Sequence, residues 1–239
     1  MPINELEQHP FLYLGETIHS HRMIVGTYPI YSLTLPRTER KVELQTQRGD
    51  VSFFYGSTSN LFWEWYQNYI DPAVNIENAE AILNSLQNKE IGISDVIKEC
   101  CRVDESFEDN KLRKKVWNKN LADKIESSVH KIICTSKSSS GAMGWLCDKI
   151  LRPQGFVPNE IESSNLHQQI LGAIPNSNTQ VKPIARVLSK KESKVSIVAL
   201  PSPGSPERRL SDFGRNAILH TTNYYLNAYL TECFNWFMK

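Results

Sequence analysis

Short apolar segments that end in small-residue turns recur along the chain. The clearest are residues 22–26, 131–136 and 194–200, each of which has the composition of a strand buried on both faces. Helical patterns separate them, and strands that alternate with helices indicate a parallel sheet covered by helices. The sequence therefore predicts an α/β fold, a three-layer α/β/α sandwich around a central, mostly parallel, four-stranded sheet.

Hydrophobic periodicity and turn residues place the other elements. Helices are expected at residues 61–70, 75–88, 118–130, 142–151 and from 216 to the end, and a hairpin at 181–188 and 194–200. The segment that begins at Gly92 predicts a strand end followed by a helix, with Ser94 or Asp95 as its cap. Two polar segments, 34–50 and 154–178, are expected to be insertions, the second with one short helix near 166–171. Residues 1–239 should form one domain.

Composition restricts the class of protein. A chain of 239 residues can bury one full core, and 40% hydrophobic with 22% charged residues is typical of soluble globular proteins. No apolar run approaches a membrane span, and the N-terminus lacks the pattern of a secretory signal. We therefore expect a cytoplasmic protein with no membrane partner. The five cysteines lack metal-site spacing, so they are predicted to be reduced and mostly buried, and no metal site is expected.

Residues 53–63, Phe-Phe-Tyr-Gly-Ser-Thr-Ser-Asn-Leu-Phe-Trp, combine aromatic side chains with a small, flexible turn and one carboxamide. The helix expected at 61–70 begins at this turn, which places Asn60 at or near a helix N-terminus beside an aromatic wall. An aromatic face next to a carboxamide can stack on and hydrogen-bond a planar ring, such as a base flipped out of DNA. The same pattern is also compatible with a capped helix whose aromatic side chains are ordinary core.

Two further loops are expected at the carboxyl ends of buried strands, where open α/β sheets bind ligands. They are Gly-Thr-Tyr-Pro at 26–29 and Leu-Pro-Ser-Pro-Gly-Ser-Pro at 200–206. Together with the 55–63 stretch, these loops resemble the uracil-DNA glycosylase superfamily. The loop at 26–29 resembles the opening Gly-x-x-Pro motif of the superfamily. The stretch at 55–63 resembles the Tyr-x-His-Pro-x-Asn-x-Phe-Trp segment of its mismatch-specific and hypoxanthine-DNA glycosylase branches. The third is similar to the Pro-Ser loop that presses on the DNA backbone. Residues 92–110, with Asp95-Val96 and Asp109-Asn110, also look like those branches.

The resemblance implies roles for single residues. Asn60 matches the carboxamide that the hypoxanthine branch uses for catalysis. The residues expected to bind the flipped base are Tyr55, on which it would stack, and Tyr28, Gly26, Thr27 and Phe62. The residues expected to contact DNA are Ser202, Pro203, Gly204, Ser205, Pro206, Arg208 and Arg209. Tyr28 is equally compatible with packing, and the two arginines with solvation of their loop. For Asp95 a helix cap is favoured over a catalytic role.

The chain also departs from the family pattern. Tyr28 stands where many relatives carry Asp or Asn, and Leu200 stands where the uracil-specific enzymes place a histidine. Residues 57–59 replace the usual His-Pro-x. Because a tyrosine does not direct a water molecule as a carboxyl or carboxamide group does, uracil specificity of the usual kind is not expected.

The chemistry of base excision favours the same role for Asn60. Hydrolysis of an N-glycosidic bond needs a sugar with oxocarbenium character and a water held on its opposite face. The Asn60 carbonyl can orient that water and stabilise the developing positive charge. No lysine nucleophile lies near the three loops. We therefore expect a monomeric, monofunctional glycosylase that needs no cofactor and leaves an abasic site in double-stranded DNA.

The small side chains at 56–59 and the two insertions suggest a base larger than uracil. A bulky modified pyrimidine, such as the glucosylated 5-hydroxymethylcytosine of phage DNA, would fit, with a role in antiphage defence. Two alternatives stay open. A repair glycosylase for hypoxanthine or uracil would use the same scaffold and Asn60, and a non-catalytic DNA-binding module would keep the phosphate loop. A nucleoside hydrolase is disfavoured because its sites usually hold a carboxylate cluster.

Charge permits DNA binding without demonstrating it. The net charge of +1 argues against a strongly basic nucleic-acid coat, although basic residues are clustered. One such run is Lys-Leu-Arg-Lys-Lys at 111–115, followed by Trp117 and Lys119. Runs of this kind are more often a solvated face than a contact.

Overall fold

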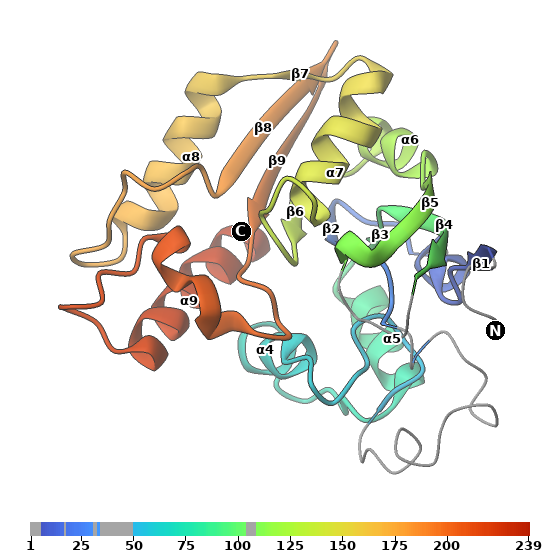
Figure 1. The fold of residues 1–239 in the computed structure, drawn as a ribbon, viewed down its shortest axis with the longest axis horizontal. Helices are drawn as coiled ribbons and strands as arrows, with labels where there is room; N and C mark the ends of the chain where they lie inside the picture. The colour runs from blue at the N-terminus through green and yellow to red at the C-terminus, as the bar shows by residue number, and fades with distance from the viewer. Residues whose placement is uncertain (1–5, 17, 31–32, 34–49, 104–108) are drawn as a thin grey trace.

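A central sheet of six strands organises the protein. The computed structural model describes residues 6–16, 18–30, 33, 50–103 and 109–239, and Figure 1 shows how their elements are arranged. The sheet has the order β3-β2-β6-β9-β8-β7. Four of its strands are parallel: β2 (Arg22–Gly26), β3 (Ile91–Asp95), β6 (Lys131–Cys134) and β9 (Ser193–Ala199). A hairpin adds β8 (Ala185–Lys190) antiparallel to β9, and β7 (Val157–Pro158) pairs with β8.

The prediction of an α/β fold with a mostly parallel sheet is confirmed, but the strand count of four is too low. The sheet is flanked by α1 (Leu12–Glu16), α4 (Phe62–Tyr69), α5 (Ala79–Asn88), α6 (Asn120–Ser127), α7 (Ala142–Trp145) with its continuation at Leu146–Leu151, α8 (Glu160–Gly172) and α9 (Thr222–Met238). Both α4 and α8 contact α9, which lies on β6, whereas α1 contacts β3 and α7 contacts β2 and β9. This arrangement is compatible with a three-layer α/β/α fold.

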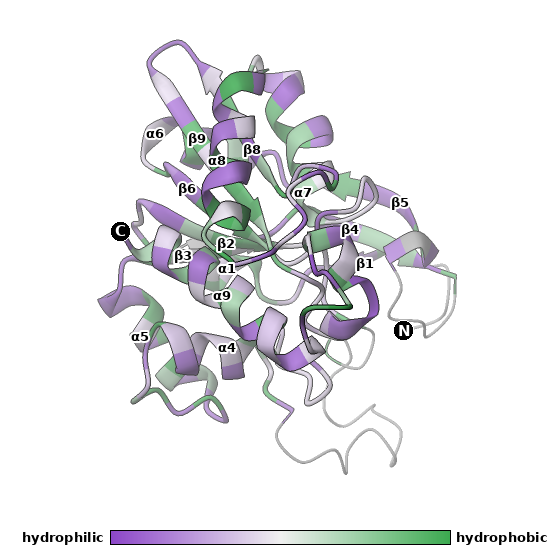
Figure 2. Ribbon diagram, turned by 90° about the vertical axis from the view of Figure 1, so that its left-hand side faces the viewer, coloured by the Kyte–Doolittle hydropathy of each residue, from purple (hydrophilic) through white to green (hydrophobic). Residues whose placement is uncertain are grey.

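The parallel strands form the centre of one continuous core. Ile24 of β2, Ile93 of β3 and Ile133 of β6 are completely buried. In Figure 2 the strands β2, β3 and β6 are largely hydrophobic and lie inside, while the helices turn hydrophilic residues outward. Strands covered on both faces require continuous apolar runs, which is why these segments could be recognised in the sequence.

Hydrogen bonds fix α9 to the sheet at its C-terminal end and near its middle. Near its C-terminus, Arg22 donates to the carbonyl oxygen of Met238 at 3.0 Å, and Lys131 donates to that of Trp236 at 3.0 Å. These cations satisfy carbonyl groups that have no partner within the helix. Further toward its N-terminus, the Tyr229 hydroxyl donates to the Ala199 carbonyl oxygen at 2.6 Å. The helix therefore runs from the carboxyl edge of the parallel strands to their amino edge.

A second, three-stranded antiparallel sheet replaces the helix expected after Gly92. It consists of β1 (Leu6–Gln8), β4 (Ile97–Arg102) and β5 (Leu112–Trp117), in the order β1-β4-β5. After Asp95 the chain stays extended, because the N–H groups of Val96 and Ile97 donate to the carbonyl oxygens of Gly26 and Thr27 at 3.0 and 3.1 Å. Asp95 and Ser94 are therefore not helix caps, and that prediction was wrong.

The segment 154–178 contributes to the main fold. Its helix, α8, is longer than the expected 166–171 and packs on β8 and α9. Asn159 caps it by accepting a hydrogen bond from the Glu162 N–H at 3.0 Å. The other expected insertion, 34–50, lies outside the described residues except for Asp50.

Two further features of the described residues concern the length of the helices and the state of the cysteines. Among the described residues, no helix is long and apolar enough to cross a membrane. All five cysteines are free and buried, as predicted. Burial raises the pKa of the Cys147 thiol to about 12, which makes it a poor nucleophile.

The close approach of α1 to β3 yields a test of the packing. A Cβ atom on Gly15 would lie 2.0 Å from the Ile93 carbonyl oxygen, whereas one on Gly172 of α8 would meet no heavy atom within 4 Å. We expect Gly15→Ala to lower the free energy of unfolding by about 1–3 kcal/mol through overpacking. Gly172→Ala should be neutral or stabilising by up to about 1 kcal/mol. Urea denaturation measures both, and equal effects would contradict the close packing.

Candidate functional site

Three chain segments meet at the carboxyl edge of the parallel strands, over Gly26. A Cβ atom at this position would lie 2.4 Å from the Tyr55 hydroxyl oxygen and 2.5 Å from Asp95 Oδ1. Only glycine leaves room for both groups. The structure thus brings the first predicted loop, the aromatic stretch and the end of β3 into contact.

The turn that carries Asn60 begins α4, as the sequence predicted. Asn60 Oδ1 accepts a hydrogen bond from the Phe62 N–H at 3.0 Å, which satisfies one of the free donors at the start of the helix. Beside this turn lies a cavity of about 200 Å³. Its lining includes Tyr55, Asn60 and Trp63, the small residues Gly56, Ser57 and Thr58, and two carboxylates, Glu64 and Glu77.

The 200–206 loop is bonded directly to the Asn60 turn. The Leu61 N–H donates to the Pro203 carbonyl oxygen at 3.1 Å. Ser202, Gly204 and Ser205 are exposed, as are Arg208 and Arg209 in the following 3-10 turn, Pro206–Phe213. Pro203 and Pro206 are buried. The loop and the turn that follows it therefore present serine hydroxyl groups and two cations to solvent.

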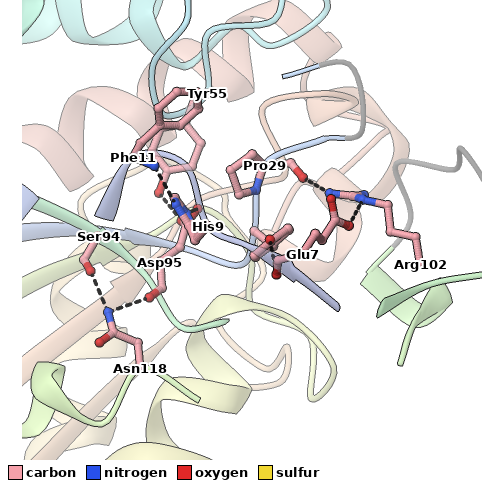
Figure 3. A network of polar contacts seen from close by, with 10 residues as sticks. Glu7, His9, Phe11, Pro29, Tyr55, Ser94, Asp95, Arg102 and Asn118 are labelled. Carbon is pink, nitrogen blue, oxygen red and sulfur yellow. Dashed lines mark hydrogen bonds and ion pairs between the residues drawn. The ribbon is translucent and has the colours of Figure 1, made fainter. Parts of the chain in front are cut away.

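A buried network of polar side chains holds Tyr55 in place, as Figure 3 shows. Its hydroxyl donates to Asp95 Oδ1 at 3.1 Å, and His9 Nε2 lies 2.8 Å from Asp95 Oδ2. His9 Nδ1 accepts the Phe11 N–H at 3.1 Å, so Nδ1 carries no proton and Nε2–H is the donor to Asp95. The Asp95 carboxylate thus receives two charge-assisted hydrogen bonds.

Tyr55 is held in an unusual backbone conformation. Its φ of 55° lies in the left-handed region, which is uncommon for a residue other than glycine and persists only where surrounding contacts impose it. Burial, the Asp95 charge and their hydrogen bond raise the pKa of Tyr55 well above its ordinary value. Tyr55 is therefore a neutral, fixed ring, one part of which lines the cavity.

Asp95 is also fixed from its main chain. Asn118 Nδ2 donates to the Asp95 carbonyl oxygen at 3.1 Å and to Ser94 Oγ at 3.1 Å. The Asn118 N–H donates to the Val96 carbonyl oxygen at 2.9 Å. The short link between β5 and α6 thereby anchors the end of β3.

Two of the residues expected to bind the base, Tyr28 and Phe62, are buried among other side chains. Tyr28 is buried, donates its hydroxyl to the Glu7 carbonyl oxygen at 3.1 Å, and lies under the Arg102 guanidinium, 5.3 Å from its ring centroid. Phe62 is completely buried, with its ring 4.9 Å from that of Tyr55. Phe62 thus packs against the Tyr55 ring from the core. Gly26 lies against Tyr55 and Asp95, and the carbonyl oxygens of Gly26 and Thr27 accept the N–H groups of Val96 and Ile97.

Asp109 is a second carboxyl group near the first loop. It makes a hydrogen bond with the Thr27 side chain, and Lys115 and Arg102 lie close enough to stabilise its charge. Burial is the largest influence, and with the nearby Asp95 charge it raises the pKa of Asp109 to about 7. This carboxyl group changes its charge near neutral pH.

Sequence reasoning missed several of these residues. His9 lies in a segment without hydrophobic periodicity and meets Asp95 across a separation of 86 residues, so no local signal marks the pair. Glu64 and Glu77 resemble ordinary exposed residues of a helix and a turn. Asp95 did carry a signal, because a carboxyl group at the end of a buried strand lies at the ligand-binding edge of the sheet. Among the described residues, no three potential metal ligands converge.

The arrangement can hold a planar ring and a water molecule. Tyr55 and Asn60 both line the cavity, and the Asn60 carboxamide can both donate and accept hydrogen bonds. Comparisons of the chain with protein-family models, with curated proteins and with solved structures found no match.

The raised pKa of Asp109 predicts a pH-dependent stability. Between about pH 4 and pH 7 the folded protein retains a proton that the unfolded chain releases, so this group makes stability fall as pH rises through that window. Asp109→Asn removes the ionisation. At pH 8 we expect the variant to be more stable than the wild type by about 1–3 kcal/mol, and near pH 4 the gain should vanish.

Denaturation at several pH values tests this expectation. Glu192→Gln, at an exposed carboxylate of the β8–β9 turn, serves as the control for a loss of negative charge. A gain for Asp109→Asn that is the same at every pH would contradict a carboxyl group with a raised pKa.

Proposed function

We propose that the protein is a monofunctional DNA glycosylase with the three-layer fold of the uracil-DNA glycosylase superfamily. The observation that carries the proposal is the hydrogen bond from Leu61 N–H to the Pro203 carbonyl oxygen. It joins the Asn60 turn to the loop proposed to contact phosphates, beside a cavity lined by Tyr55. A base excision enzyme needs a catalytic group, a pocket for the base and a contact for the phosphates, all close enough to act on the same nucleotide.

The proposed reaction begins with extrusion of a nucleotide from the duplex. The flipped base stacks on Tyr55, whose ring is fixed by Asp95 and Phe62, and stacking offsets part of the cost of unpairing. The loop 202–206 and the arginines at 208 and 209 hold the flanking phosphates. Asn60 Oδ1 already accepts the Phe62 N–H, and the second lone pair of a carbonyl oxygen can orient the attacking water. The N-glycosidic bond breaks with its electron pair leaving on the base, water forms the new bond to the sugar carbon, and the proton that water loses ends on the departing base. An abasic site remains.

The favoured substrate is a bulky pyrimidine that carries a sugar, such as glucosylated 5-hydroxymethylcytosine, and the favoured role is antiphage defence. The cavity beside the Asn60 turn has a volume of about 200 Å³. Its small residues at 56–58 leave space, and Glu64 and Glu77 can accept hydrogen bonds from sugar hydroxyl groups. The same carboxylates would repel a phosphate, which argues for a neutral, hydroxyl-rich group in this cavity.

Asn60→Ala is expected to lower excision by about 10²–10⁴-fold, the range for a group that positions or activates a reactant. The assay is alkali-induced cleavage of labelled duplexes that contain uracil, hypoxanthine, 5-hydroxymethylcytosine or its glucosylated form. Asn159→Ala is the matched control, because Asn159 Oδ1 likewise accepts a backbone N–H at the start of a helix, from Glu162 at 3.0 Å, and Asn159 does not line the cavity.

The panel also separates the alternatives. Asn60-dependent cleavage restricted to hypoxanthine or uracil would replace the defence role by repair of deaminated bases. If the protein bound DNA but cleaved no substrate, it would be a non-catalytic DNA-binding module, and the enzymatic proposal would fail.

The two cavity carboxylates give a test of the substrate class. We expect the double variant Glu64→Gln, Glu77→Gln to reduce the ratio of glucosylated to unglucosylated excision by about tenfold, the effect of one or two weakened hydrogen bonds. Glu80→Gln, at an exposed position in the first turn of α5, is the control. An unchanged ratio would remove these residues from sugar recognition.

A further inference from the structure

The strand β5 carries most of the basic run at residues 111–115, which has no role in the proposed base site. It is an edge strand of the β1-β4-β5 sheet, and its sequence is Leu-Arg-Lys-Lys-Val-Trp. Arg113 and Lys114 are exposed, and Lys119, two residues beyond the strand, is exposed as well. We call Arg113, Lys114 and Lys119 the β5 basic strip.

The strip begins at the candidate site and leads away from it. Trp117, the last residue of β5, pairs with Ile97, whose N–H donates to the Thr27 carbonyl oxygen at 3.1 Å. The next residue, Asn118, holds the Asp95 carbonyl oxygen. In Figure 1, β5 lies to the right of α4, whereas α9 and the orange-red 206–213 turn lie to its left. In this view, β5 and the 206–213 turn therefore lie on opposite sides of α4.

Two of the strip's cations occupy positions that do not favour them. Lys114 has a φ of 45°, in the left-handed region that is uncommon for lysine, at a register shift between β4 and β5. Lys119 is the N-cap residue of α6, makes no capping bond with its side chain, and brings positive charge to the positive end of the helix dipole. A bound polyanion would offset the unfavourable charge of Lys119 at the start of α6.

Two nearby lysines, Lys115 and Lys98, are not counted in the strip because each has a contact of its own. Lys115 lies with Nζ 5.1 Å from the centroid of the Trp145 ring, and its pKa is lowered by burial and by Arg113, so it belongs to the packing between β5 and α7. On β4, Lys98 lies 3.8 Å from Glu99. Edge strands often carry lysine to prevent association with other sheets, and that alone would explain one exposed cation. It does not explain a lysine at the start of α6.

The geometry points to the β5 basic strip as a second contact for the DNA backbone, on the side of the flipped nucleotide opposite to the 202–209 loop. The partner is the phosphodiester backbone of duplex DNA, chosen because the exposed groups are cations and the strip continues from the proposed base site. This inference rests on the proposed function. It adds that the enzyme holds the duplex on both sides of the extruded base, so that strain in the bent or opened duplex is shared between two anchors.

The test compares the triple variant Arg113→Gln, Lys114→Gln, Lys119→Gln with the wild type in binding to a labelled duplex over a range of salt concentrations. We expect the slope of log K against log salt to decrease by about 2–3, at about 0.9 for each phosphate contact, and affinity to fall at least about tenfold at low salt. Excision at saturating enzyme should keep its rate, because the strip does not touch the reacting atoms.

The matched control is Lys89→Gln, Lys149→Gln, Lys191→Gln, which removes three exposed cations away from the carboxyl edge. A third variant, Arg208→Gln, Arg209→Gln, reports on the other anchor. If the loop variant loses affinity and the strip variant keeps the wild-type slope, the inference is overturned while the proposed function stands. If the wild type binds no DNA, both fail. Melting temperatures of all variants exclude a folding defect as the cause.

Discussion

The missing side chain at Gly26 is the constraint on which the candidate site depends. Because β2 carries no Cβ at its carboxyl end, the Tyr55 hydroxyl and the Asp95 carboxylate can meet directly above the strand. In this position Tyr55 adopts a left-handed backbone conformation, which is unfavourable by itself. The contacts with Asp95 and Phe62 hold the residue there. A rigid ring at the edge of a parallel sheet results, which is the kind of preorganised surface that recognition of a flat ligand requires.

The cost of burying Asp95 explains why so many distant segments converge on it. An isolated carboxylate that is 1% exposed would be strongly destabilising, so its charge must be matched by hydrogen bonds. His9 from the N-terminal segment and Tyr55 from the aromatic stretch provide them, and Asn118 fixes the backbone. The network therefore connects the segment after β1, the aromatic stretch and the link between β5 and α6 to the end of β3 in one hydrogen-bonded unit.

Charge is distributed unevenly around this unit. Carboxylates line the cavity at Glu64 and Glu77, while exposed cations lie at Arg208, Arg209 and along the β5 basic strip. A net charge of +1 conceals this separation, because the opposite charges cancel in the sum. A polyanion can be held on the flanks while a neutral, hydroxyl-rich group enters between them.

The sequence by itself determined the parallel strands, most of the helices and the position of Asn60 at the start of α4. These features depend on local periodicity and capping, which short-range physical rules describe well. The tertiary structure alone decided that residues 97–102 form a strand, that His9 donates to Asp95, and that Phe62 and Tyr28 are packed rather than open. Each of these outcomes depends on partners remote in the chain: β4 on pairing with β1 and β5, and Asp95 on a histidine 86 residues away. Such long-range pairings leave no periodic trace in either segment, so the polar network could not be read from the sequence.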